Sequence, residues 1–299
     1  MPRSFLLVKR YAIASCLRRV PCPHCLQLRV GVKSSDSAFI CSSPLESSLM
    51  KTIISPKTLA VLTLAALPML ASAQLSANVS LVTNYKTRGQ DQDVREGQLR
   101  PALQGGFDYS HASGFYAGNW NSTVNFQTSA TGPTANLESD LYAGYIFATG
   151  ELSWDAGVLR YHYTGASAVN TTELYLGVGW GPLSAKYYHT VSDDYFNAAG
   201  SALGSGLKGK GTGYLNVAYA QEIHPKWTLK ASLGYTSYSS DITLPNYVDY
   251  SVGAVYDLGD GFSVSGAMVG ATKKNSFLGK ADGKSVNANT LVMMFTKKM

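Results

Sequence analysis

The stretch VDYSVGAVYDL, residues 248–258, is the clearest guide to the fold. Its even-numbered residues are all apolar or tyrosine, whereas its odd-numbered residues include two aspartates, a serine and a glycine. Successive side chains of a strand point to opposite sides, so this period of two predicts a strand with one apolar and one polar face. The same alternation recurs over residues 173–180 and 227–235.

Segments of this kind follow one another through the whole of residues 74–299. The composition agrees, since 45% hydrophobic and only 15% charged residues exclude an intrinsically disordered chain. With 29 Gly and 19 Tyr and no long runs of Ala, Glu, Lys and Leu, the chain is also unlike a helical bundle. The predicted strands are centred near residues 81, 105, 120, 143, 157, 176, 186, 217, 231, 253, 266 and 294.

The connections between these strands alternate between two kinds. Short ones with Gly or Pro turn residues fall at 110–114, 149–150, 181–182, 224–225 and 259–261. Long ones rich in Gly, Ser, Asn, Asp and Lys fall near 89–98, 127–137, 164–170, 191–210, 239–246 and 272–288. Tight turns on one side and long loops on the other are typical of an all-β, transmembrane, antiparallel up-and-down β-barrel of about twelve strands. A secreted soluble sandwich or a lipocalin-like barrel is the alternative, but neither requires short and long connections to alternate regularly.

The front of the chain has a different character. Residues 50–73 read as a secretory signal peptide, with Lys51 and Lys57 before the apolar stretch LAVLTLAALPML and a cleavage site between Ala73 and Gln74. A signal preceded by residues 1–49 is unusual, so we expect translation to start at Met50 and residues 1–49 to be an upstream mis-start segment. Residues 74–299 then form the mature outer-membrane barrel of a Gram-negative bacterium.

The net positive charge of the chain comes from residues 1–73. Residues 1–49 hold seven Lys or Arg and two Asp or Glu, and residues 50–73 add two Lys, so the whole-chain net charge of +6 leaves −1 for residues 74–299. This gives no argument for nucleic acid as a partner. All four cysteines lie within residues 1–49.

In a membrane barrel the polar face of each strand points into the lumen, and aromatic residues near strand ends form girdles at the bilayer surfaces. Strand parity therefore predicts lumen-lining side chains, and it predicts girdle positions for Tyr85, Trp120, Trp154, Trp180, Trp227 and Tyr256. The candidate lumen-lining residues are Lys86, Arg88, Asp108, Asn119, Asn121, Asp155, Glu173, Lys186, Lys230 and Asp249.

Several stretches of this sequence resemble the TorF-type putative porins, a family of proteobacterial outer-membrane proteins. They are NYKTRG (84–89), PALQGGFDYSHASGFYAG (101–118), LSWDAGVLRYHYTGA (152–166) and NTTELYLGVGWGPLSAKYYHTVSDDYF (170–196), and the likeness is strongest over residues 75–236. The resemblance implies a porin-like barrel and brings no substrate or catalytic residue. The ending FTKKM departs from the terminal aromatic residue usual in outer-membrane barrels, although Leu291, Met293, Phe295 and Met299 share one face.

Three functions are consistent with such a barrel. The first is a narrow channel for passive diffusion of small polar solutes or ions, because twelve strands fall between side-chain-filled eight-stranded barrels and open sixteen-stranded ones. The second is a closed structural or surface-contact barrel, whose lysine-bearing loops meet outer-membrane lipid and lipopolysaccharide. The third, an enzyme, is disfavoured because the histidines of residues 74–299 lack catalytic or metal-site spacing. We expect no cofactor and no metal, and the oligomeric state stays open.

Overall fold

The computed structural model describes residues 73–95, 99–127, 134–277, 279 and 283–299. The predicted upstream segment, and the predicted signal peptide up to residue 72, lie outside these described residues. The first strand begins at Ala73, beside the predicted cleavage site.

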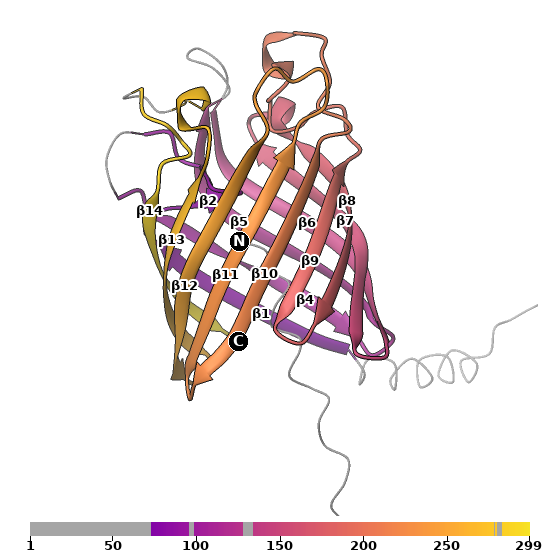
Figure 1. Ribbon diagram of the computed structural model, residues 1–299, viewed down its shortest axis with the longest axis vertical. Coiled ribbons are helices and arrows are strands. Elements are labelled where there is room, and N and C mark those ends of the chain that lie inside the picture. Colours follow the sequence, from indigo (N-terminus) through magenta and orange to yellow (C-terminus); the bar gives the residue numbers. More distant parts are fainter. Residues whose placement is uncertain (1–72, 96–98, 128–133, 278, 280–282) are drawn as a thin grey trace, which may run out of the picture. The chain divides into compact units, whose positions relative to one another are not determined.

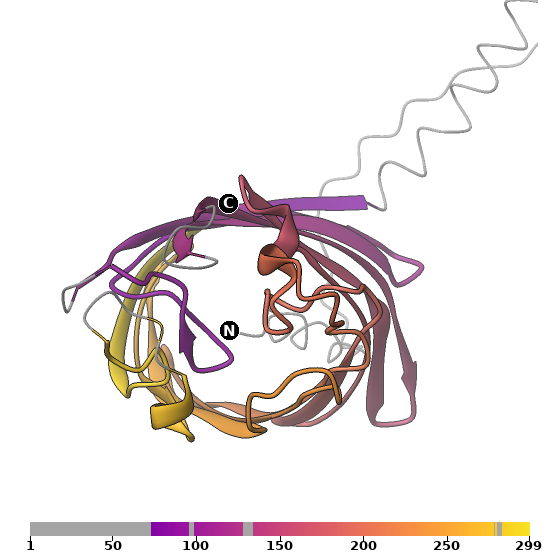
Figure 2. The same cartoon turned by 90° about the horizontal axis from the view of Figure 1, so that it is seen from above.

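Twelve strands close into one antiparallel barrel, which confirms the fold class expected from the sequence (Figures 1 and 2). Each predicted strand centre falls inside an observed strand, and β1 pairs with both β4 and β14 to complete the ring. The strands are β1 (Ala73–Val82), β4 (Ala102–His111), β5 (Phe115–Gln127), β6 (Thr134–Thr149), β7 (Leu152–Thr164), β8 (Thr171–Trp180), β9 (Leu183–Thr190), β10 (Gly213–His224), β11 (Trp227–Ser237), β12 (Tyr247–Gly259), β13 (Phe262–Ala271) and β14 (Thr290–Lys298).

Tight turns lie at one end of the barrel and long connections at the other, as expected (Figure 1). Two expected boundaries are wrong. The connection expected over 127–137 is shorter, because β6 already begins at Thr134, and the one expected from residue 89 begins after Val82. That longer connection contains a small hairpin of β2 (Lys86–Thr87) and β3 (Gln90–Asp91).

Helical structure in the described residues is limited to three short 3-10 turns, η1 (Ser167–Val169), η2 (Ser201–Leu203) and η3 (Lys274–Ser276). All three belong to the long connections. None of the described helices is long and apolar enough to cross a membrane.

The two faces of the barrel wall differ in chemistry. The outward side chains are mostly large and apolar, and many stay exposed, such as Leu103 at 56% and Leu233 at 61%. Inward side chains are mostly polar, aromatic or small, and several inward charged groups are buried, including Glu173 and Asp249. An apolar exterior around a polar interior is the arrangement of a barrel that spans a bilayer.

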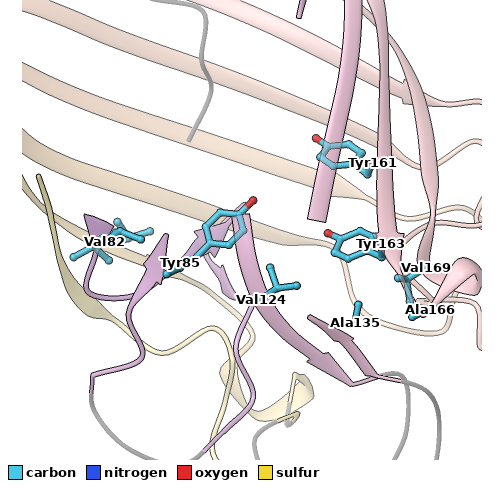
Figure 3. Close-up of a cluster of buried hydrophobic side chains, with 11 residues drawn as sticks. Val82, Tyr85, Val124, Ala135, Tyr161, Tyr163, Ala166 and Val169 are labelled. Atoms are coloured by element: carbon cyan, nitrogen blue, oxygen red, sulfur yellow. The ribbon is translucent and has the colours of Figure 1, made fainter. Parts of the chain in front are cut away.

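The buried apolar side chains gather at the loop end, where connections fold over and into the barrel. Figure 3 shows the largest cluster, in which Tyr161 and Tyr163 of β7 lie near Tyr85 and Val124. Further clusters join the β9–β10 connection to the β11–β12 and β13–β14 connections. The loop end is therefore a packed layer, and it positions the candidate site.

Candidate functional site

A hairpin of the β1–β4 connection lies inside the barrel. We call residues 86–91 the inner hairpin, in which Lys86 pairs with Asp91 and Thr87 with Gln90. Arg88 and Gly89 form its turn, with φ of 49° and 76°. Two consecutive positive φ values define a type I′ turn, which suits glycine at the second position but is unusual for arginine at the first. Seen along the barrel, the purple segment that carries this hairpin lies within the ring of strands (Figure 2).

The turn residue Arg88 reaches the far wall of the barrel. Its Nη2 lies 2.5 Å from Oε2 of Glu173 on β8, and its Nη1 donates to the hydroxyl of Tyr195 at 2.9 Å. β8 is five strands away from β1 around the ring, so this ion pair spans the lumen. Both side chains are almost fully buried.

Aromatic rings enclose the guanidinium of Arg88. Its Cζ lies 4.2 Å from the ring centroid of Tyr214 on β10 and 5.4 Å from that of Tyr188 on β9. Tyr195 and Phe196 of the β9–β10 connection complete the enclosure at 5.9 Å and 5.8 Å. Cations over aromatic faces are attracted by the ring quadrupole, so these rings add to the ion pair in holding Arg88.

Arg88 remains charged in this position. Burial acts to lower the pKa of its guanidinium, but the nearby Glu173 carboxylate outweighs burial, and the pKa is raised above its ordinary value. The inner hairpin therefore carries a permanent positive charge into the lumen.

The other turn residue, Gly89, fits closely against the β12–β13 wall. A Cβ atom at this position would lie 2.7 Å from the carbonyl oxygen of Gly270, 2.8 Å from Cβ of Asp249 and 2.9 Å from Cβ of Ala271. Only glycine combines this close approach with the observed positive φ.

The neck of the inner hairpin is held by a second buried charge cluster. Asp91 lies 2.9 Å from Nζ of Lys86 and 3.1 Å from Nη2 of Arg100, which comes just before β4. Lys86 also donates to the carbonyl of Val286 in the β13–β14 connection at 2.9 Å, and the amide of Asp91 donates to the same carbonyl at 3.0 Å. The neck is thus fixed from two sides of the barrel.

A third contact ties the start of the inner hairpin to β6. The hydroxyl of Tyr85 donates to Oε1 of the fully buried Glu138 at 3.0 Å, and the hydroxyl of Thr87 donates to Tyr85 at 2.7 Å. The ring of Tyr85 meets that of Trp120 on β5 edge to face, with centroids 5.4 Å apart.

A separate charged group lies on the wall between β5 and β9. Asp155 of β7 lies 2.5 Å from Nζ of Lys186 on β9, and it accepts a hydrogen bond from the hydroxyl of Tyr116 at 2.5 Å. Nζ of Lys186 also lies 4.2 Å from the ring centroid of Tyr175. The wall from β5 to β10 is therefore lined by tyrosines and paired charges.

The remaining wall, along β11, β12, β13 and β1, carries smaller inward side chains. Serine, glycine, alanine and asparagine predominate there, and they are partly or fully exposed although they face inward. The residues are Ser232, Ser251, Gly253, Ser263, Ser265, Ala267, Ser76 and Asn78. Lys230 of β11 and Lys298 of β14 face inward and are exposed, and no described acidic residue forms an ion pair with either of them.

The structure brings most of the predicted lumen residues inside the barrel. The inward residues Asp108, Asp155, Glu173, Lys186, Lys230 and Asp249 lie on the strands expected to carry them. Lys86 and Arg88 are inside for a different reason, because β1 ends at Val82 and both belong to the inner hairpin.

The prediction for Asn119 and Asn121 is wrong. Asn119 pairs across the sheet with Phe107 and Leu141, which are both exposed on the outward face, so Asn119 and Asn121 face outward as well. Trp120 faces inward against Tyr85, and neither aromatic residue belongs to a girdle. In this part of β5 the usual rule is reversed, because the amides face outward while Trp120 packs inside the lumen.

Sequence reasoning missed most of the side chains that hold the inner hairpin in place. Asp91, Arg100 and Tyr195 lie in connections, where strand parity makes no prediction. One signal was available: the sequence Thr87-Arg88-Gly89-Gln90 has glycine at the position that a two-residue hairpin turn favours.

A family model described as "Bacterial protein of unknown function (Gcw_chp)" matches residues 69–299. A comparison with curated proteins gives no match. Among solved structures, the chain is similar to the KdgM porin, with a TM-score of 0.45 and 10% identity over 75% of this chain and 97% of that chain. The NanC porin gives 0.45 and 10% over 75% and 98%, and OmpT of Vibrio cholerae gives 0.36 and 9% over 76% and 97%.

Proposed function

We propose that this chain, which belongs to the Gcw_chp family of bacterial proteins of unknown function, is an outer-membrane channel for small polar solutes or ions. In this proposal the inner hairpin narrows the loop end of the lumen. Passage is diffusive, and no catalytic step is assigned to any residue. The resemblance to the TorF-type putative porins agrees with this role.

The membrane location is supported by the wall itself. A closed barrel leaves no sheet edge unpaired, which hydrocarbon requires, and its outward face is mostly apolar. The signal peptide expected over residues 50–73 would deliver the barrel across the inner membrane, and the Gram-negative outer membrane is its expected site.

The single observation that carries the channel proposal is the contrast between the two ends of the lumen. Towards the loop end the inward side chains are buried, with Tyr175 and Tyr188 at 7% and 8% exposure and Asp249 at 6%. Towards the turn end the inward side chains stay partly or fully exposed on both sides of the barrel, among them Asp155 on β7 and Lys230 on β11. A water-accessible lumen at the turn end favours a path for solutes that is narrowed only at the loop end.

The competing reading is a closed barrel that acts through its loops. It is favoured by the pairing of inward charges, since Arg88 with Glu173 and Lys186 with Asp155 neutralise one another. In that case the inner hairpin would be a structural plug rather than a constriction.

Single-channel conductance in planar bilayers separates these readings. The folded protein, verified by heat-modifiable gel migration, is compared with a variant in which residues 86–91 are replaced by a Gly-Ser linker. The proposal expects small discrete current steps from the natural chain and at least about twofold larger steps from the variant. Silence from both proteins would favour the closed barrel and overturn the channel proposal.

A further inference from the structure

We propose that the outward face of β4, β5 and β6, centred on Asn119 and Asn121, is the contact surface for a second copy of this chain within the membrane. This inference rests on the proposed membrane location, but not on whether the lumen conducts. We call this surface the amide patch.

The two amides of the amide patch lie beside the apolar outward side chains of Phe107 and Leu141. Nδ2 of Asn121 donates to Oδ1 of Asn119 at 2.5 Å, and longer contacts of 3.4 Å reach the carbonyls of Gly105 and Asp140. The hydrogen bonds of the described residues leave Oδ1 of Asn121 without a donor. Hydrocarbon offers no donor either, so a protein partner is the source that fits.

The depth of the amides in the wall supports this argument. Asn119 follows Phe115, at the turn end of β5, by four residues. With about 3.3 Å of rise per residue and a strand tilt of about 40°, Asn119 lies roughly 10 Å above Phe115. The apolar band of such a barrel is about 25 Å tall, which puts the amides well inside it.

The neighbours of Asn121 are small, whereas Asn119 pairs with the larger Phe107 and Leu141. Asn121 pairs with Gly105 on β4 and Ser139 on β6, while Ala117 pairs with Ala143. Elsewhere the outward positions mostly carry Leu, Val, Phe, Tyr or Trp. Small residues at a membrane interface let two backbones approach closely, and polar side chains then bond across the contact.

A second copy of the chain fits this surface better than another partner. All copies insert in the same direction, so a two-fold axis along the membrane normal brings the same patch of two copies together. Asparagine carries both a donor and an acceptor, so the amide pair is complementary to itself under that rotation.

Crosslinking in the membrane tests the proposal. In the full chain with Cys16, Cys22, Cys25 and Cys41 replaced by serine, one cysteine is introduced by Ser139→Cys on the amide patch. A matched variant carries Ala231→Cys on β11, which lies on the opposite side of the ring. Outer membranes containing each folded variant are treated with a short bismaleimide.

We expect a crosslinked dimer from Ser139→Cys and at least tenfold less from Ala231→Cys. Adding Asn119→Leu and Asn121→Leu to the Ser139→Cys chain is expected to lower the dimer band at least fivefold, while heat-modifiable migration and conductance remain unchanged. Equal crosslinking at both positions, no dimer at Ser139, or a product with a different protein would overturn the proposal. If the natural chain shows no conductance, that result counts against the proposed channel and does not affect the test of the dimer.

Discussion

At the scale of single residues, the contact between Arg88 and Glu173 decides whether the inner hairpin stays across the lumen. Removing one partner of a buried ion pair leaves an uncompensated charge and costs about 3–5 kcal/mol. The closed ring of strands does not include the inner hairpin. We therefore expect Arg88→Met to release the hairpin from the β8 wall under conditions in which the barrel itself stays folded. The variant should show larger conductance steps and a lower urea midpoint of tryptophan fluorescence.

The double variant Arg88→Met with Glu173→Leu separates charge from position. Replacing both charges by apolar groups of similar size is often neutral for stability. We therefore expect the urea midpoint to return toward that of the natural protein. A double variant as unstable as Arg88→Met alone would show that the ion pair is not the dominant contact of Arg88.

Gly89 provides a steric test at the same turn. The Cβ of Gly89→Ala would lie under 3.0 Å from the β12–β13 wall, and the residue would keep an unfavourable positive φ. We expect the inner hairpin to shift and the conductance steps to change in size or become noisy. Gly150→Ala is the matched control, because Gly150 also has a positive φ but nothing lies within 4 Å of its Cβ position. Identical recordings from the two variants would contradict the close fit of Gly89.

The orientation of single side chains is the feature that the sequence predicts least well. The rule that polar side chains face the lumen assigned Asp155 and Lys186 to the inward side, where the structure has them. The same rule assigns the residues of β5 to the wrong faces. An indole ring such as that of Trp120 packs as favourably on another ring inside the barrel as it does against lipid outside. Polarity alone cannot distinguish an aromatic residue that fills the lumen from one that faces hydrocarbon.

At the scale of elements, the strands follow directly from the alternation in the sequence, but the inner hairpin does not. β2 and β3 are two residues each, too short for any period to be detected. The hairpin is held by groups far away in the chain, such as the carboxylate of Glu173 and the backbone carbonyl of Val286. A local pattern cannot predict contacts of that sequence separation.

The neck of the inner hairpin depends on the charge of Asp91. Asp91→Asn would leave Lys86 and Arg100 buried beside a neutral side chain, so we expect it to loosen the neck at a cost of about 3–5 kcal/mol. Amide hydrogen exchange measures this, because the amides of Asp91 and Gln92 are bonded to Val286 and Tyr85. Faster exchange at these amides is the expected result.

Asp193→Asn is the control for that experiment. Asp193 pairs with Lys208 in the β9–β10 connection, their side chains are 62% and 58% exposed, and exposed pairs contribute about 0–1 kcal/mol. Exchange at the neck should be nearly unchanged in this variant. An equal effect from both variants would mean that Asp91 has no special role.

Across the whole molecule, the loop end of the lumen is packed and its turn end is open to water. Apolar side chains of the long connections form buried clusters at the loop end, whereas the tight turns contribute to none of these clusters. A solute that passes the inner hairpin therefore meets Lys230 and Lys298 before it leaves at the turn end. No described acidic residue forms an ion pair with these two lysines, and the inward carboxylate of Asp257 on β12 is the nearby opposite charge.

Ion selectivity follows from this arrangement, because rings or pairs of one charge sign raise the local concentration of the opposite ion. We expect Lys230→Glu with Lys298→Glu to move the reversal potential in a salt gradient toward cations, with the effect largest at low ionic strength, where screening is weakest. Lys208→Glu is the matched control, since Lys208 lies in the β9–β10 connection and pairs with Asp193 at 3.1 Å, away from the turn end. A reversal potential that moves equally in both variants would show that charge anywhere on the barrel is sufficient. A potential that does not move would place the solute path away from β11 and β14.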